Sequence, residues 1–201
     1  MMADLRSTIF SALTGRSADV SGKADGDLHG MLMAVGGAST KTKSGIDLTR
    51  AAKALGVSRR TVERWAVTAK TGAGQRPSAQ HSKTLSTKAR QAATTKAGRK
   101  AAMARSNLRK QVTSRGARVT ITGDQGPIIG ADYRRRRSTT LDLDPDQAAA
   151  MMDAFEEGGE KGFMSWANDF WGEEYVSDWS FSTEPGGIDG IDIEPPGRGS
   201  W

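Results

Sequence analysis

The sequence predicts an α+β protein with an N-terminal helical domain that contains a helix-turn-helix, a basic helical connector and a small C-terminal α+β domain. Three observations support this prediction. Residues 48–65 have the spacing of two short helices around a glycine turn. No acidic residue occurs between Glu63 and Asp124. Nine of the 12 aromatic residues lie in residues 141–201, which can therefore build a core that the basic middle cannot.

These patterns divide the chain into four expected segments. We expect a helical domain at 1–69, a partly helical basic connector at 70–117, an α+β domain at 118–194 and a tail at 195–201. Within the first segment, apolar residues at helical spacing predict short helices at 3–15 and around 28–35, ahead of the helix-turn-helix.

The helix-turn-helix is the most specific local pattern. Its first helix has apolar residues at helical spacing: Leu48, Ala51, Ala52 and Leu55. Gly56 follows where the turn needs a positive φ angle, which glycine adopts without steric cost. Ser58 is a good N-cap for the second helix, because its hydroxyl can accept a free backbone N–H. Val62 and Trp65 supply the buried stripe of that helix.

The polar residues of the second helix predict DNA binding. They are Ser58, Arg59, Arg60, Thr61 and Arg64. In this motif the N-terminal residues of the second helix meet base edges in the major groove, and arginine can bind guanine with two hydrogen bonds. The alternative is a helical hairpin on the surface that binds no ligand.

Charge is distributed unevenly along the chain. Residues 1–140 hold 27 lysines and arginines and 8 acidic residues, a net charge of +19. Residues 141–201 hold 2 and 15, a net charge of −13, which gives the overall +6. The basic residues 1–140 favour binding to a polyanion. The acidic residues 141–201 suggest a different partner, or contact with the basic part of the same chain.

The basic connector is expected to contact the DNA backbone. Residues 83–113 are rich in Ala, Lys, Arg and Gln, which favour helix. Lys96, Arg99 and Lys100 are the proposed phosphate contacts within this stretch. The alternative is a flexible basic linker.

The C-terminal third alternates between strand and helix signals. The predicted elements are a strand at 118–122, a turn at 123–127, a strand at 133–144, helices at 145–157 and 161–175, and strands at 176–183 and 188–193. Asp144 and Pro145 form a good helix start, as N-cap and first helical residue. Gly158 and Gly159 are expected to end the first of the two helices.

The sequence lacks the residues and motifs typical of several classes of protein. The chain has no cysteine and two histidines, so thiol catalysis and disulfides are excluded and an imidazole-rich metal site is not expected. No enzyme motif is present, and we expect no cofactor. No apolar run reaches transmembrane length and no secretory pattern opens the chain, so we expect no membrane partner and a cytoplasmic, nucleoid-associated protein. Homo-oligomerisation stays open.

A second basic patch lies near the predicted strand at 133–144. Tyr133 is followed by four arginines, Arg134, Arg135, Arg136 and Arg137, and then by three hydroxyl residues, Ser138, Thr139 and Thr140. Guanidinium groups could hold these hydroxyls near phosphates, where a polymerase could use one of them as a primer. The alternative is that these arginines form the basic end of a strand and contact DNA or the acidic residues 141–201.

This layout resembles the terminal proteins (Tpg type) of actinomycete linear chromosomes and plasmids over roughly residues 45–194. The specific matches are the stretch from Arg60 to Arg64 with Trp65 behind it, and the stretch from Lys88 to Thr95. The resemblance implies a protein that caps replicon ends and is bound covalently to 5′ DNA ends through a hydroxyl. It also implies the partners: single- or double-stranded telomere ends, a DNA polymerase and a telomere-associated protein.

The same resemblance implies an acceptor hydroxyl for protein-primed synthesis. The family's priming residue is a threonine in or near the stretch that matches Gly126 to Tyr133, and that stretch has no threonine here. The candidates are therefore Tyr133, Ser138, Thr139 and Thr140, with Tyr133 and Thr139 ranked first and Thr122 as a weaker one. The protein would then be a primer acceptor rather than an enzyme itself. The main alternative is a plasmid or phage transcription regulator without covalent chemistry, and a third possibility is a structural nucleoid-type binder.

Overall fold

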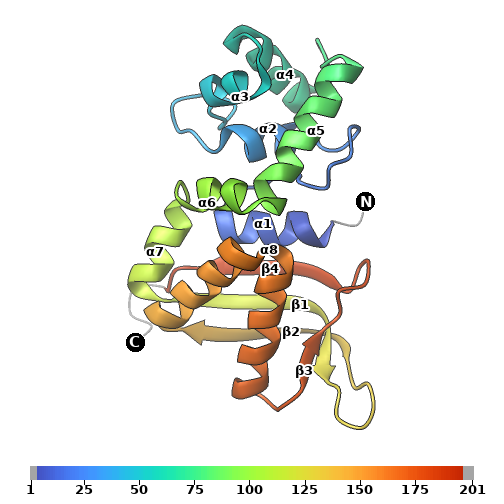
Figure 1. The fold of residues 1–201 in the computed structure, drawn as a ribbon, viewed down its shortest axis with the longest axis vertical. Coiled ribbons are helices and arrows are strands. Elements are labelled where there is room, and N and C mark those ends of the chain that lie inside the picture. Colours follow the sequence, from blue (N-terminus) through green and yellow to red (C-terminus); the bar gives the residue numbers. More distant parts are fainter. Residues whose placement is uncertain (1–3, 197–201) are drawn as a thin grey trace. The chain divides into compact units, whose positions relative to one another are not determined.

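The computed structural model describes residues 4–196, so most of the expected tail lies outside the described residues. Within that range the chain forms eight helices and one four-stranded antiparallel sheet, which confirms the mixed α and β class (Figure 1). Contacts divide the chain into two compact units. We call them the helical unit (residues 16–105) and the sheet unit (residues 4–15 and 106–196).

The helical unit contains five helices, each of which begins at an Asp, Ser or Thr side chain that caps its N-terminus. They are α2 (Leu28–Gly36), α3 (Leu48–Leu55), α4 (Arg59–Thr71), α5 (Ala79–Thr94) and α6 (Lys96–Met103). Side chains from all of them share one core, which includes Met31, Leu32, Leu48, Ala51, Val62, Trp65, Leu85, Ala89 and Met103. The ring of Trp65 in α4 lies 5.4 Å from that of His81 in α5.

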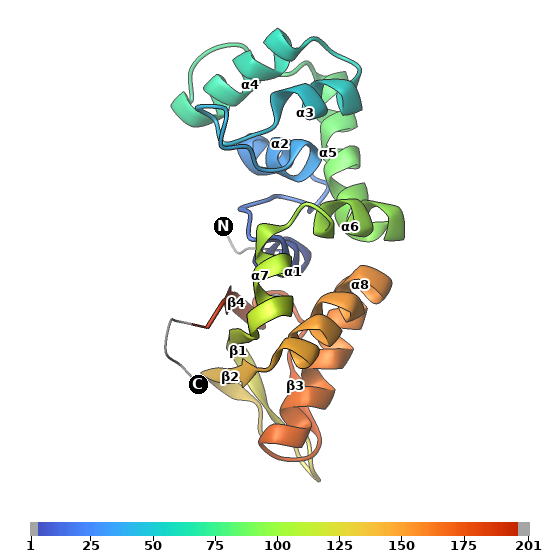
Figure 2. The ribbon, with the colours of Figure 1, turned by 90° about the vertical axis from the view of Figure 1, so that its left-hand side faces the viewer.

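The sheet unit surrounds its sheet with three helices. Its elements are α1 (Leu5–Thr14), α7 (Asn107–Arg115), β1 (Ala117–Pro127), β2 (Arg135–Leu143), α8 (Pro145–Glu174), β3 (Trp179–Phe181) and β4 (Ile188–Glu194). Strand β1 is central: β2 pairs along one edge, while β3 and β4 share the other. Figure 2 shows α8 on one side of the strands, and Val119, Ile121 and Leu143 are buried on the face toward it.

Helix α8 begins and bends where the sequence predicts. Asp144 caps it and accepts the backbone N–H of Gln147, whose side chain in turn accepts the N–H of Asp144. Gly159 has φ 65° and ψ −143°, which breaks the helix into two segments. Only glycine adopts this backbone region easily, so the predicted end of the first helix is confirmed as a kink.

The unit boundaries differ from the expected segments at two places. Helix α1 packs with the sheet unit rather than with α3 and α4, because the ring centroids of Phe10 and of Phe155 in α8 are 6.3 Å apart. The residues expected to form a separate connector are shared between the units: α5 and α6, with buried Leu85 and Met103, belong to the helical unit, while α7, with buried Val112, belongs to the sheet unit.

The turn predicted at 123–127 is wrong. Strand β1 continues to Pro127, and the chain reverses only in the loop at 128–134. At Gly126, which resembles a turn residue in the sequence, glycine instead lets two backbone segments lie close together. A side-chain carbon at Gly126 would lie 2.8 Å from the carbonyl oxygen of Tyr133. Glycine inside a strand often marks such an approach.

Candidate nucleic-acid interface

Helices α3 and α4 meet at a tight turn that the local sequence dictates. Gly56 ends α3 in the left-handed conformation with φ 67°. The hydroxyl of Ser58 then accepts the backbone N–H of Thr61 at 3.1 Å and starts α4, as predicted. Val62 and Trp65 are buried, which fixes how α4 is rotated about its axis.

That rotation leaves the arginines of α4 on its solvent side. Arg59, Arg60 and Arg64 are exposed, and so is Val67, one turn further along. Glu63 is the single acidic side chain of the helix. The face is therefore a basic strip on a helix whose opposite side is anchored in the core.

Two open grooves border this strip. The first is lined on its far side by Ala73, Gly74 and Gln75, and Nη1 of Arg64 donates a hydrogen bond to Oε1 of Gln75 at 3.3 Å. The second is lined by Lys41, Lys43 and Lys70 besides α4 residues. Nζ of Lys70 donates to the carbonyl of Lys43 at 3.1 Å, which ties the loop at 39–45 to the end of α4. Apart from Lys70, which belongs to α4, these flanking residues come from loops that carry no motif in the sequence.

The connector residues do not share one role. Lys96 and Lys100 are exposed, whereas Arg99 is buried with 6% of its surface accessible. Nη1 of Arg99 donates to the carbonyls of Thr94 at 2.9 Å and Ala93 at 3.4 Å. It therefore provides a hydrogen-bond donor to backbone carbonyls at the C-terminal end of α5. The expectation that Arg99 contacts DNA phosphate is wrong in this structure, because its guanidinium is used inside the fold.

The four consecutive arginines also separate, because successive side chains of a strand point to opposite faces. Arg134 donates to both carboxylate oxygens of Asp132, from Nε at 3.0 and 3.2 Å and from Nη2 at 2.7 Å. This pairing lowers the pKa of Asp132 to about 2, mainly through the side-chain hydrogen bond and then through the backbone N–H of Arg134. Arg135 is exposed and carries no carboxylate partner among the residues described.

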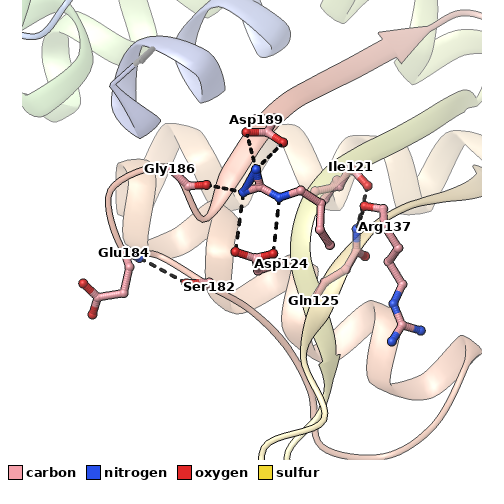
Figure 3. Close-up of polar contacts among 9 residues, drawn as sticks. Ile121, Asp124, Gln125, Arg137, Ser182, Glu184, Gly186 and Asp189 are labelled. Carbon is pink, nitrogen blue, oxygen red and sulfur yellow. Dashed lines mark hydrogen bonds and ion pairs between the residues drawn. The ribbon is translucent and has the colours of Figure 1, made fainter. Parts of the chain in front are cut away.

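The last two arginines of the run act within the sheet unit. Arg136 contacts the carboxylates of Asp124 and Asp189 and the carbonyl of Gly186, which joins β2 to the start of β4 (Figure 3). Arg137 lies over the ring of Trp179 at 5.5 Å from its centroid. The run is therefore not a continuous DNA-binding patch, and Arg136 in particular is held by protein groups.

Thr139 is not an accessible hydroxyl, which corrects its ranking as a candidate acceptor. Its residue is 9% exposed, and its Oγ1 donates to Oε1 of Gln125 at 2.5 Å while it accepts from Nε1 of Trp171 at 2.8 Å. Gln125, which is fully buried, is a partner that the sequence did not predict. A glutamine in a polar segment gives no local signal that it will serve the core.

The neighbouring hydroxyls lie on the open face of the sheet. Ser138 pairs with Thr122 at 2.6 Å, and Thr140 pairs with Thr120 at 2.8 Å, in register across β1 and β2. Arg118 and Asp142 extend this row with a two-pronged ion pair that lowers the pKa of the Asp142 carboxyl. Ser138, Thr140 and Thr122 therefore stay accessible, but each hydroxyl already has a partner.

Tyr133 is an exposed candidate acceptor that lies outside the strands. It lies in the loop between β1 and β2 and is 51% exposed. Ile128 and Ile129 in the same loop are 44% and 47% exposed. Arg134 and Arg135 follow directly. This loop thus combines a phenol, apolar side chains and positive charge at one accessible place.

Two kinds of structural feature are absent from residues 4–196. No helix between residues 4 and 196 has both the length and the apolar character needed to cross a lipid bilayer. The same residues contain no group of three or more His, Asp or Glu side chains placed to hold a metal ion. Comparisons with protein-family models, with curated proteins and with solved structures find no match to this chain.

Proposed function

We propose that this chain is a sequence-preferring DNA-binding protein in which α3 and α4 form a helix-turn-helix. The observation that carries the proposal is the exposed face of α4, where Arg59, Arg60 and Arg64 project away from the buried Val62 and Trp65. A helix anchored in this way can enter the major groove as a rigid body, with its N-terminal residues toward base edges. Ser58 and Thr61 at the helix start add hydroxyls to that surface.

The grooves beside α4 suit the sugar-phosphate backbone. Lys41, Lys43 and Lys70 line one of them and add positive charge next to the proposed reading helix. Lysine and arginine contacts to phosphate provide affinity and register, whereas base contacts provide sequence preference. We therefore assign the three lysines to positioning and the α4 arginines to readout.

The test begins by selecting bound duplexes from a random-sequence pool and measuring gel shifts on the selected duplex and on a scrambled one. Arg64→Ala should weaken binding to the selected duplex by about 1–3 kcal/mol more than to the scrambled one. Arg115→Ala removes one exposed arginine from α7 and is the matched control, with little expected effect on either duplex. Failure to enrich any sequence, or equal losses on both duplexes, would contradict base readout by α4.

We further propose that the protein acts at replicon ends as a terminal protein, on the basis of the family resemblance together with the loop at 128–134. In this proposal Tyr133 is the acceptor. Its Oη would attack the α-phosphorus of a deoxynucleoside triphosphate, forming an O–P bond while the bond between the α-phosphorus and the bridging oxygen breaks. Pyrophosphate leaves, and the phenolic proton passes to solvent. The polymerase's metal ions would supply activation, since the two histidines of the chain, His29 and His81, belong to the helical unit and Tyr133 belongs to the sheet unit.

An exposed position in a loop supports Tyr133, whereas Ser138 and Thr140 lie in β2 and pair with hydroxyls of β1. A priming hydroxyl must enter a polymerase active site, and Tyr133 lies in a loop with exposed Ile128 and Ile129, which offer apolar surface for a protein partner. The deciding observation is whether protein purified from its native cells carries nuclease-resistant DNA linked through a 5′ end. Protein that binds DNA specifically but carries no such adduct would favour the transcription-regulator alternative.

A further inference from the structure

Three arginines from separate parts of the helical unit converge on one place. Arg16 precedes α2, Arg50 lies in α3 and Arg105 follows α6. The carbonyl oxygen of Ala102 accepts both Nη2 of Arg16 at 2.7 Å and the backbone N–H of Arg105 at 3.3 Å. A side-chain carbon at Gly37 would lie 3.2 Å from Nη1 of Arg16 and 3.6 Å from Nη1 of Arg50, so these two nitrogens are within about 7 Å of each other.

Negative charge at this cluster does not match the positive charge. Among residues 4–196, Asp47 is the carboxylate whose charge acts on Arg105, and its Oδ2 is 3.9 Å from Nη2 of Arg50. Its other oxygen accepts the backbone N–H of Arg50 as the cap of α3. The side chains of Arg16 and Arg50 otherwise donate to the backbone carbonyls of Ala102 and Gly36. The backbone carbonyls of Ala102 and Gly36 thus offset part of the positive charge, but within the described part of the chain Asp47 is the one carboxylate paired with these three arginines.

Burial makes the imbalance costly. Arg16 is 7% exposed, and charged side chains are rarely buried to this degree without a charged partner. Burial lowers the pKa of Arg16, and the charges of Arg105 and Arg50 lower it further. Burial and the charge of Arg50 also lower the pKa of Arg105, against the opposing effect of Asp47. Because arginine keeps its proton in proteins, the repulsion persists at neutral pH unless an anion relieves it.

We propose that Arg16, Arg50 and Arg105 together bind one phosphate group. A phosphate offers several strong acceptor oxygens, and two charge-assisted hydrogen bonds of about 2.8 Å with the phosphate between them span the separation of the Arg16 and Arg50 nitrogens. Access comes from the outer two residues, since the Arg50 side chain is 41% exposed and Arg105 lines an open groove with alanines of α5 and α6. Arg16 forms the buried end of the site.

The phosphate group has two possible sources, the backbone of DNA or a small phosphate-bearing solute. The first source rests on the proposed DNA-binding function and the second does not. Both use the same chemistry, so the experiment contains one arm for each. The base-reading residue Arg64 is on α4 and outside this cluster, which keeps the two proposals separable.

The first arm follows arginine Nε–Hε signals by NMR in the full chain, titrated with sodium phosphate at constant ionic strength and with sodium chloride as the comparison salt. Phosphate should give a saturable shift of the Arg16 signal that chloride does not give. Arg105→Gln should weaken phosphate binding at least tenfold, and Arg115→Gln, a change of equal charge on α7, should leave it unchanged. Arg105 is chosen because it is exposed, so its replacement tests the site without removing the buried Arg16.

The second arm measures duplex binding of Arg105→Gln as a function of salt. A backbone contact predicts equal losses on selected and scrambled duplexes and a salt slope smaller by about 0.9. Phosphate binding with unchanged duplex binding would assign the site to a small solute. The proposal is overturned if phosphate gives no saturable shift and Arg105→Gln leaves duplex binding intact. Sequence preference that still depends on Arg64 would then show that DNA recognition by α4 stands without it.

Discussion

The hydroxyl of Thr139 accepts the indole N–H of Trp171 at 2.8 Å and so joins β2 to α8 inside the core. The same hydroxyl donates to Gln125 at 2.5 Å. Replacement by valine keeps the shape but leaves two buried polar groups without a partner. We predict that Thr139→Val lowers the free energy of unfolding by about 1–3 kcal/mol, measured by urea denaturation.

Thr140→Val is the control for this prediction. Thr140 is the next residue of β2, and its hydroxyl bonds to Thr120 on the exposed face, where water can replace the lost partner. The free energy of unfolding should change by less than about 0.5 kcal/mol. Equal stability of both variants would argue against the buried hydrogen bonds of Thr139.

Two adjacent glycines in α8 should respond in opposite directions. Gly159 has φ 65° and ψ −143°, so Gly159→Ala forces alanine into a strained conformation and should cost about 1–3 kcal/mol. A side-chain carbon at Gly158 meets no atom within 4 Å, so Gly158→Ala should stabilise by about 0.4–1 kcal/mol. Thermal unfolding of both variants measures the difference. Loss of stability in the Gly158 variant would contradict the position of the kink.

The basic residues of α6 should divide into two classes. Arg99→Gln should lower the free energy of unfolding by about 1–3 kcal/mol, because Arg99 serves carbonyls at the end of α5. Replacing Lys96 and Lys100 with glutamine should instead flatten the salt dependence of DNA binding, by about 0.9 in slope for each lysine that contacts a phosphate. An unchanged slope would show that neither lysine contacts DNA.

Asp132 provides a pH-dependent test of the loop between β1 and β2. Its pKa is about 2 in the folded protein, against a usual value of 3.8, because Arg134 holds the charged carboxylate. Its pairing therefore contributes stability above pH 3.8, and this contribution is lost as the pH falls through about 2. An NMR titration of the carboxyl carbon should show this low pKa, and Arg134→Gln should return it toward 3.8. An identical titration curve in both proteins would exclude the pairing.

If Tyr133 is the nucleotide acceptor, replacing its hydroxyl should abolish labelling and replacing Ser138 should not. Incubation with labelled deoxynucleotide, a cognate polymerase and single-stranded telomere template should label a peptide that contains Tyr133. Tyr133→Phe should abolish the label, since it removes only the phenolic oxygen. Ser138→Ala should retain it, because that hydroxyl already pairs with Thr122 across the sheet. Label that persists in the Tyr133 variant would reject this assignment.

Local sequence alone determined much of the helical unit. Ser58, Gly56 and the stripe of Val62 and Trp65 define the start, turn and rotation of α4 through contacts a few residues apart. The same holds for the start of α8 at Asp144. Such features are predictable because caps, turn glycines and helical spacing act within one or two turns of chain.

Only the tertiary structure decided which polar side chains remain available. Arg99, Arg136 and Thr139 look like surface groups in the sequence, yet each is held by partners in the fold. The partners of Arg136 and Thr139 lie as far as 53 and 32 residues away in the chain. The packing of α1 against α8 has the same origin. An amphipathic pattern shows that a face will be buried, but the partner is selected by shape and charge across the folded chain.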